Sequence, residues 1–258
     1  MSPPTTSSGL VEHRIELGIV ELGLARPEVR NALNEATAIA LCERLQALAE
    51  DPTVRCVILH GQGQAFCAGA DLGEFDTGNQ RLASERLAIL FEPALNAMVA
   101  MDKPVIAAVS GAAAGIGVSY VLASDMVVMG KSAYLKLAFI NIGLIPDGGA
   151  CWHLAHRLGH ARAFELATMA TPIDAAQSLS LGLANRVVED GEELAEARRL
   201  AQELVSRSPT ALAATKHALR GASQLTLQET MRLEGQLQDH CKSAPDFQER
   251  VQAFRQRR

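Results

Sequence analysis

Two short loops carry the residues best placed for chemistry. Residues 65–72 follow a predicted buried strand, and the small residues around Gly69 would let backbone approach a ligand closely. Residues 110–117 also follow a predicted buried strand and lead into a predicted helix, whose free N–H groups favour developing negative charge. Side by side, the two loops could each give one N–H to a single carbonyl oxygen, forming an oxyanion hole. Each loop taken alone is more typical of a tight turn whose glycines ease packing.

Other reactive residues point to simpler roles. His153, His156 and His160 have the spacing of a helical metal site, but the absence of a nearby Cys or carboxylate favours a partly exposed helix. Cys67 has no readable His partner, which favours a small buried thiol over a nucleophile. The glycines at 115–117 begin a dinucleotide fingerprint but lack its third glycine, and no phosphate-binding G-x-x-x-x-G-K motif is present. We therefore predict no metal and no separate cofactor.

Composition sets the broad class. The chain has 258 residues, 48% of them hydrophobic and 21% charged, which indicates a globular protein with a sizeable core. A formal net charge of -5 argues against nucleic acid as a partner. Five scattered cysteines without a C-x-x-C pair indicate reduced thiols and a cytoplasmic location. Apolar runs are too short to span a membrane, and residues 1–12 do not resemble a signal peptide.

Hydrophobic periodicity predicts an α/β fold. Strands and helices alternate after a flexible N-terminal lead over residues 1–12, and the strands are short continuous apolar runs. Expected strands cover 14–22, 54–60, 105–110 and 126–129, and expected helices cover 35–50, 79–101 and 117–124. Beyond residue 148 helices predominate, at 149–158, 160–169, 174–181, 193–207, 209–221, 226–243 and 246–256. This pattern predicts a core over residues 13–190 and a helical C-terminal region over residues 191–258.

Five segments recur in an order and spacing that together indicate a family. They are Arg-Pro-Glu-Val-Arg-Asn-Ala-Leu-Asn at 26–34, residues 65–72, Lys-Pro-Val-Ile-Ala-Ala-Val-Ser-Gly at 103–111, Ile-Gly-Leu-Ile-Pro-Asp-Gly-Gly at 142–149, and residues 176–183 followed by Val187. From about Ile15 to Arg255 the chain resembles the crotonase, or enoyl-CoA hydratase/isomerase, family. The resemblance implies a spiral of β-β-α units, a C-terminal helical region used in oligomerisation, and an acyl-CoA thioester as substrate. It also implies a homotrimer or a hexamer.

The resemblance assigns roles by position. The backbone N–H groups of Ala70 and Ile116 would be the two oxyanion donors. Arg26, Arg30, Ala68, Gly69, Asp71 and Leu72 would flank the CoA moiety. Gly115, Ser119, Phe139 and Leu144 would border the substrate, and Phe75, Phe91, Phe139 and Leu144 suggest a pocket for an apolar acyl group. Residues near the C-terminus, Lys242, Phe247 and Phe254, would reach the CoA of a neighbouring subunit.

Departures from the family pattern concern the reaction itself. Hydratases of this family use two glutamates, and this chain has Ser119 and Phe139 in their places, which disfavours ordinary hydration. One acid remains nearby, Asp147. Its segment most resembles the ring-opening and double-bond isomerases of phenylacetate catabolism, in which an aspartate there transfers a proton; a related dehalogenase uses it as a nucleophile. Asp147 could instead cap the following helix, and a cap would lower its pKa.

The sequence thus favours an isomerase over its alternatives. In that hypothesis Ala70 and Ile116 hold the thioester oxygen, and Asp147 removes a proton and returns it to another carbon. The alternatives are a hydratase or other crotonase reaction, including epoxide-ring isomerisation and dehalogenation, and a non-catalytic acyl-CoA-binding member of the family. The sequence leaves the acyl group open.

Overall fold

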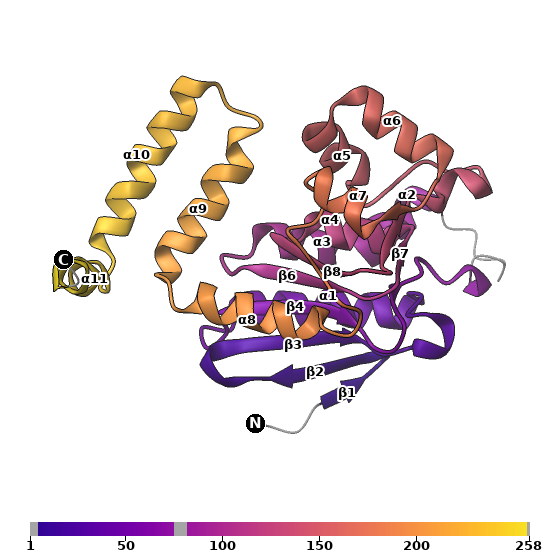
Figure 1. The fold of residues 1–258 in the computed structure, drawn as a ribbon, viewed down its shortest axis with the longest axis horizontal. Coiled ribbons are helices and arrows are strands. Elements are labelled where there is room, and N and C mark those ends of the chain that lie inside the picture. Colours follow the sequence, from indigo (N-terminus) through magenta and orange to yellow (C-terminus); the bar gives the residue numbers. More distant parts are fainter. Residues whose placement is uncertain (1–4, 75–81, 257–258) are drawn as a thin grey trace.

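The computed structural model describes residues 5–74 and 82–256, and its larger sheet has seven strands (Figure 1). Their spatial order is β1 (Thr5–Ser7), β2 (Leu10–Arg14), β3 (Ile19–Leu24), β4 (Cys56–Gly61), β6 (Val105–Val109), β8 (Met126–Gly130) and β11 (Arg186–Val188). From β3 to β11 neighbouring strands are parallel, with Val57 of β4 opposite both Val20 and Val105. These strands are mostly apolar because both faces of the sheet are covered.

A second sheet of four short strands lies beside the first. Its order is β10 (Ile173–Asp174), β9 (Tyr134–Lys136), β7 (Ala112–Ala114) and β5 (Ala65–Cys67). Each of β4, β6 and β8 continues after a few residues into a strand of this sheet, and the chain then enters helical segments. This repeat is the predicted spiral of β-β-α units, and it brings the loops after β5 and β7 together because those two strands pair in parallel.

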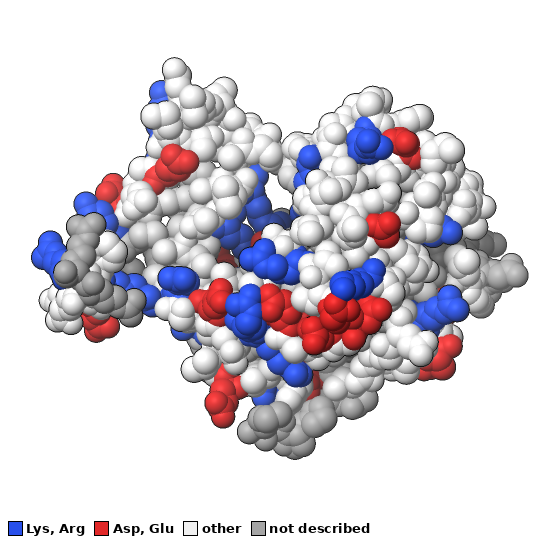
Figure 2. All heavy atoms as spheres, viewed as in Figure 1, with Lys and Arg blue, Asp and Glu red and all other residues white. Residues whose placement is uncertain are grey.

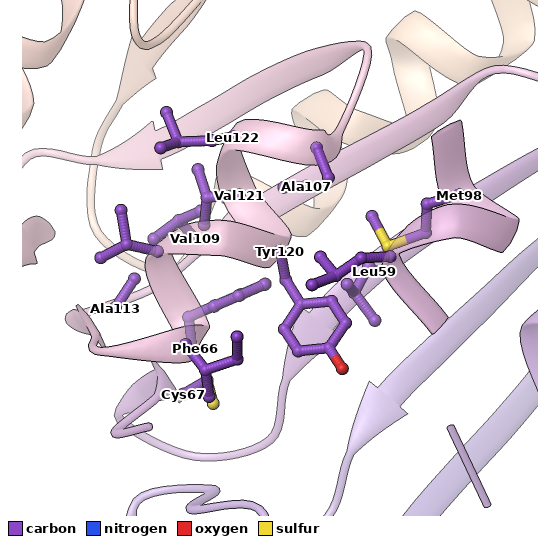
Figure 3. Packing of buried hydrophobic residues seen from close by; sticks show 14 of the residues in the cluster. Leu59, Phe66, Cys67, Met98, Ala107, Val109, Ala113, Tyr120, Val121 and Leu122 are labelled. Carbon is purple, nitrogen blue, oxygen red and sulfur yellow. The ribbon is translucent and has the colours of Figure 1, made fainter. Parts of the chain in front are cut away.

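Three helices cover one face of the large sheet. They are α1 (Glu35–Glu50), α3 (Glu92–Ala100) and α4 (Ile116–Ala123). Asn34 caps α1 as predicted, its side chain accepting a hydrogen bond from the N–H of Thr37 at 2.9 Å. All eight residues of α4 are buried, and Figure 3 shows Tyr120 from this helix among Leu59, Phe66 and Met98. The core therefore encloses the helix that follows the second candidate loop.

The predicted helix over 79–101 is helical without a gap from Ala83 to Ala100 and contains one π-helical turn. Residues 79–81 lie outside the described part, and the rest forms α2 (Ala83–Arg86), a π-helical turn (Leu87–Phe91) and α3. Pro93 stands in the first turn of α3, where its missing N–H removes no hydrogen bond of that helix. The π-helical turn directly precedes this proline, and the helix continues through it.

The opposite face of the sheet is covered by α8 (Glu193–Val205). Its residues Ala197, Leu200, Ala201 and Val205 pack against a layer formed by Ile19, Cys56, Ile58, Ile106 and Val128. The buried carboxylate of Glu21 on β3 accepts hydrogen bonds from the guanidinium of Arg198. The core therefore extends to about residue 205, past the boundary predicted at residue 190, because the second apolar face of the sheet needs this helix.

Three further helices form an arm that stands away from the body (Figure 1). They are α9 (Pro209–Ala222), α10 (Leu227–Ser243) and α11 (Phe247–Gln256), close to the predicted helices. Lys216 and Arg220 of α9 attach the arm to the body through Asp125 and through backbone carbonyls, including Met98 O at 3.0 Å from Lys216 Nζ and Ala123 O at 3.0 Å from Arg220 Nη2. In the described chain no helix is both long and apolar enough to cross a membrane.

The N-terminal segment differs from the predicted lead. Strand β1 begins at Thr5, and β2 pairs antiparallel with β3, burying Leu10. The predicted strand over 14–22 is in fact two strands joined by a turn at Glu16–Gly18. Leu17 (φ 64°) and Gly18 (φ 76°) turn the chain, and the Leu17 side chain is exposed, so apolar alternation there did not signal a buried strand.

Candidate active site

The two loops proposed from the sequence touch each other. A Cβ atom placed on Gly69 would lie 3.2 Å from Ala114 O, and one placed on Gly115 would lie 3.6 Å from Gly69 Cα. Gly69 (φ +109°) and Gly115 (φ +53°) both have a backbone conformation that glycine adopts readily. The two loops are therefore in van der Waals contact, and the positive φ at both positions favours glycine there.

Neither the N–H group of Ala70 nor that of Ile116 has a hydrogen-bond acceptor among the described residues. Leu33 bridges the first loop by donating to Gly69 O (2.8 Å) and accepting from Asp71 N (2.9 Å), so the N–H of Ala70 between them is directed away from Leu33. Ile116 is the first residue of α4, and the first N–H groups of a helix lack intrahelical partners. The structure thus brings together the two predicted donor residues.

Asp147 lies beside the same helix end. It stands between a 3-10 turn (Ala138–Ile142) and α5 (Ala150–Leu158). Ser119 Oγ of α4 donates to the backbone oxygen of Asp147 at 2.8 Å. A Cβ atom on the next residue, Gly148, would lie 2.5 Å from Ile116 Cδ1 and 2.9 Å from Ser119 Cβ. The turn that carries the carboxyl group is therefore pressed against the first turns of α4.

The Asp147 carboxyl group does not cap α5. The N-cap position is Gly149, which has no side-chain cap, and Ala150 N donates instead to the backbone oxygen of Asp147 at 3.0 Å. The carboxyl atom Oδ1 is buried and has no hydrogen-bond partner among the described residues. Burial raises the pKa of Asp147 to about 6, against a smaller lowering by a hydrogen bond from its own backbone. The pKa of this carboxyl group is therefore raised, whereas a helix cap would have lowered it.

No carboxylate occupies the two positions where hydratases carry glutamates. Ser119 is 0% exposed, and its hydroxyl donates to Asp147 O. Phe139 is 7% exposed and its backbone oxygen accepts from Leu144 N at 3.0 Å, while the Leu144 side chain is 40% exposed. Between them these residues offer no acid or base to a water molecule.

The residues predicted to flank CoA form one structural unit. Arg26 Nη1 lies 3.0 Å from Asp71 Oδ2 and donates to Ala32 O at 2.7 Å, so the charges of Arg26 and Asp71 largely neutralise each other. Ala68 N donates to Arg30 O at 2.9 Å, and the side chains of Arg30 and Leu72 are exposed. Residues 26–33 and 68–72 therefore form a joint edge with one cation, Arg30, facing solvent.

Asn31 supports this edge and was not singled out from the sequence. It is 1% exposed and has φ 58°, a conformation that Asn tolerates better than most residues. Its Nδ2 donates to Gln62 O (2.9 Å) and Ala65 O (2.7 Å), and its Oδ1 accepts from Arg26 N (2.9 Å). In the sequence Asn31 is an asparagine in a predicted loop, and that observation alone predicts only a turn.

The burial of His153, Cys67 and Phe91 favours a structural role for each of them. Burial, followed by repulsion from Arg157, lowers the pKa of His153 to about 4, and the described residues contain no cluster of three potential metal ligands. Burial raises the pKa of the Cys67 thiol to about 12, which leaves no thiolate for catalysis. Phe91 is buried, and Phe75 lies outside the described residues.

A hollow of about 940 Å³ separates the arm from the body (Figure 2). It borders the Asp147 turn through Gly148 and Gly149, and its walls include Trp152 of α5 and Leu219 of α9. Three cations, Arg157, Lys216 and Arg220, line it together with Asp125, and all three cations bond to backbone oxygens of the body. The hollow is thus adjacent to the candidate site but does not contain the Asp147 carboxyl group.

The match to known proteins decides the family. The model of the enoyl-CoA hydratase/isomerase family matches residues 14–258. The chain belongs to this family. It is 36% identical over 244 residues to the 1,2-epoxyphenylacetyl-CoA isomerase of Escherichia coli K12, covering 93% of each chain, and 37% identical over 248 residues to a probable enoyl-CoA hydratase of Rhodobacter capsulatus, covering 96% of this chain and 95% of that one.

Solved structures of the family have the same fold. The crystal structure of an enoyl-CoA hydratase from Polaromonas sp. JS666 matches with a TM-score of 0.87 and 36% identity, covering 99% of this chain and 97% of that one. Isomerases and hydratases both occur among the relatives of this family member, so overall similarity does not choose between the reactions. The choice depends on the side chains at the site.

Proposed function

We propose that this family member is an acyl-CoA isomerase that shifts the double bond of an enoyl-CoA. The observation that carries the proposal is the half-buried Asp147 carboxyl group, which has one oxygen lacking a partner among the described residues and stands next to Gly148, the residue packed against Ile116. Burying a carboxyl oxygen without a partner costs stability, and groups of this kind are typical of functional sites. Its elevated pKa supports a role in proton transfer near neutral pH.

In the proposed site the thioester oxygen lies between the N–H groups of Ala70 and Ile116. Their adjacency at the Gly69–Gly115 contact supports this role. Negative charge builds on that oxygen when a proton leaves the neighbouring carbon, and each preorganised donor typically contributes about 3 kcal/mol to stabilising it. The two donors therefore make the C2 protons of a 3-enoyl-CoA more acidic.

Asp147 then carries the proton between carbons. Its carboxylate takes a proton from C2, and the electron pair of that bond spreads over the thioester oxygen and C4 as a dienolate. The resulting carboxylic acid returns the same proton to C4, which leaves the double bond between C2 and C3. No atom is gained or lost, so a single carboxyl group suffices. A pKa of about 6 lets the group act first as base and then as acid at neutral pH.

Hydration would need a different arrangement. Adding water across the double bond requires a water molecule held by an acid and a base. Ser119 and Phe139 are both buried and neither has a carboxylate, which supports isomerisation over hydration. Opening of an epoxide on an acyl-CoA uses the same oxyanion donors, and the similarity to the E. coli epoxide isomerase makes it the second candidate reaction.

The rest of the proposal concerns the substrate and the assembly. Residues 26–30 and 68–72 would flank the CoA moiety, with Arg30 available to its phosphates, and Phe139 and Leu144 would face an apolar acyl group. CoA enters as part of the substrate, and no further cofactor is required. The arm exposes Leu219, Leu227, Met231 and Phe254, which supports packing of the arm on neighbouring subunits in a trimer or hexamer. We place the enzyme in the cytoplasm because its thiols are unpaired.

The test is turnover of 3-enoyl-CoA and 2-enoyl-CoA by the purified protein, followed by chromatography and mass spectrometry. D147N should lose at least about 100-fold in kcat while its Kd for the CoA ester changes little. D102N is the matched control, because Asp102 is an exposed aspartate outside the site, and it should retain full activity. The kcat/KM of the unmodified enzyme should rise with pH through about 6, since the carboxylate is the starting form.

The other outcomes separate the alternatives. Full turnover in D147N would refute the role of Asp147. Uptake of labelled solvent oxygen into a 3-hydroxyacyl product would identify a hydratase, and conversion of an epoxyacyl-CoA alone would identify the ring isomerase. Tight binding of CoA esters with no turnover across the panel would identify a non-catalytic member of the family.

A further inference from the structure

Ser119 holds the Asp147 turn from the side of α4. Its hydroxyl group is 0% exposed and donates to the backbone oxygen of Asp147 at 2.8 Å. The same oxygen accepts from Ala150 N at 3.0 Å. The carbonyl therefore receives one hydrogen bond from α4 and one from α5, which uses both of its lone pairs.

The turn needs such a constraint. An aspartate oxygen that is buried without a partner would gain free energy by rotating into water, so the backbone must resist that movement. The neighbouring Gly148 (φ +56°) has no side chain, because a Cβ atom there would clash with Ile116, Leu95 and Ser119. Glycine imposes little torsional restraint, so the two hydrogen bonds to the Asp147 carbonyl help to hold the backbone from which the carboxyl group extends.

We propose that Ser119 is a positioning residue, whose hydrogen bond to the Asp147 carbonyl keeps the turn that carries the carboxyl group packed against the first turns of α4 and one carboxyl oxygen away from water. The inference rests on the proposed role of Asp147. Ser119 itself does not touch the substrate, because its hydroxyl is buried and its proton is engaged by the carbonyl. Its contribution to the rate comes entirely through the geometry of Asp147.

The chain offers a matched control on the same helix-and-cap segment. Ser124 follows the last residue of α4, is 3% exposed, and donates its hydroxyl to the backbone oxygen of Tyr120 at 3.0 Å. S119A and S124A therefore remove the same kind of buried hydrogen bond, one at the Asp147 turn and one away from it. S119C keeps the size of the side chain but substitutes a weak donor, so it should fold if S119A does not.

The first measurement is the steady-state kinetics of the double-bond shift. S119A should lower kcat at least about ten-fold with KM within about two-fold, because substrate contacts remain while the base is misplaced. S119C should lie between S119A and the unmodified enzyme. The acid limb of kcat/KM should move to lower pH in S119A by about half a pH unit or more, since a carboxyl group open to water ionises more easily. S124A should change neither quantity.

The second measurement does not depend on turnover. The difference in urea midpoint between the unmodified protein and D147N should change with pH, because only the unmodified protein has the buried carboxyl group. In the S119A background this pH-dependent difference should shrink by about half or more, and in the S124A background it should persist. Equal behaviour of S119A and S124A in both measurements would overturn the proposal, whereas full activity of D147N would refute the proposed base and not the contact made by Ser119.

Discussion

Removing the charge of Asp147 should stabilise the protein at neutral pH. In the folded chain burial raises the pKa of this carboxyl group from its ordinary 3.8 to about 6, and no described residue compensates its buried oxygen. In the unfolded chain the group ionises near its ordinary pKa. Between these two values the unfolded state releases a proton that the folded state retains, so stability falls as pH rises through this window. D147N has no such penalty because its side chain never ionises.

The expected size follows from the same pKa values. A change from 3.8 to about 6 corresponds to about 3 kcal/mol for a fully buried group, and partial exposure of the carboxyl group reduces this to about 2 kcal/mol. The free energy of unfolding of D147N relative to the unmodified protein should therefore rise by about 1.3 kcal/mol between pH 4.5 and pH 7.5, because about a third of the ~2 kcal/mol is already present at pH 4.5. Below the window the two proteins should differ little, since both side chains are then neutral.

The assay is urea unfolding of both proteins at one fixed concentration, at several pH values across that range. Other titrating groups affect both proteins equally, so the difference isolates Asp147. A D147N variant that is less stable at pH 7.5 than the unmodified protein would refute the reasoning. That result would mean that the ionised carboxyl group is stabilised in the fold, as a helix cap would be.

Two further predictions concern a glycine and the thiols. G148A should destabilise the protein by about 2 kcal/mol and lower activity more than ten-fold, because its Cβ would lie 2.5 Å from Ile116 Cδ1. G143A is the control in urea unfolding. Gly143 also has a positive φ, but no atom lies within 4 Å of an added Cβ, so G143A should cost only about 1 kcal/mol. Iodoacetamide at pH 8 should modify the exposed Cys151 and spare Cys56 and Cys67, whose pKa burial raises to about 12, as read by peptide mass spectrometry; equal labelling of Cys67 would contradict its described burial.

The sequence predicted the fold better than the details of the site. Continuous apolar strands and helical spacing located most of the α/β core and all four helices beyond residue 190, because those patterns reflect burial directly. The packing partner of α8 could not be predicted from hydrophobic periodicity. The apolar stripe of this helix shows that it packs on something, whereas its partner is a sheet face formed by residues at least 60 positions earlier. The prediction of one strand over 14–22 was wrong for a related reason. Leu17 is exposed in a turn, yet its place in the sequence continues the apolar alternation of a strand.

At the site, the sequence named residues but not their partners. Ala70, Ile116 and Asp147 were predicted together from family resemblance, and the structure brings them to one helix end. Two facts became visible only in the structure: the Asp147 side chain leaves its helix uncapped, and the Ser119 hydroxyl donates to the Asp147 backbone oxygen. Both depend on which way one carbonyl points, and residue types at fixed spacing do not determine that direction. Asn31 was missed for the same reason, because its importance lies in hydrogen bonds to backbone, two of them to residues more than 30 positions along the chain.

The pairing of Glu21 with Arg198 has a consequence for the order in which the molecule is made. These partners are 177 residues apart, and α8 also supplies the apolar cover for β3, β4, β6 and β8. A chain emerging from the ribosome therefore completes most strands of the sheet long before the helix that covers one face exists. Until then that face is bare and the Glu21 carboxylate lacks its guanidinium partner, so the nascent chain passes through a period of exposed apolar surface. The charged Glu21 carboxylate on that face makes it less prone to aggregation until α8 covers it.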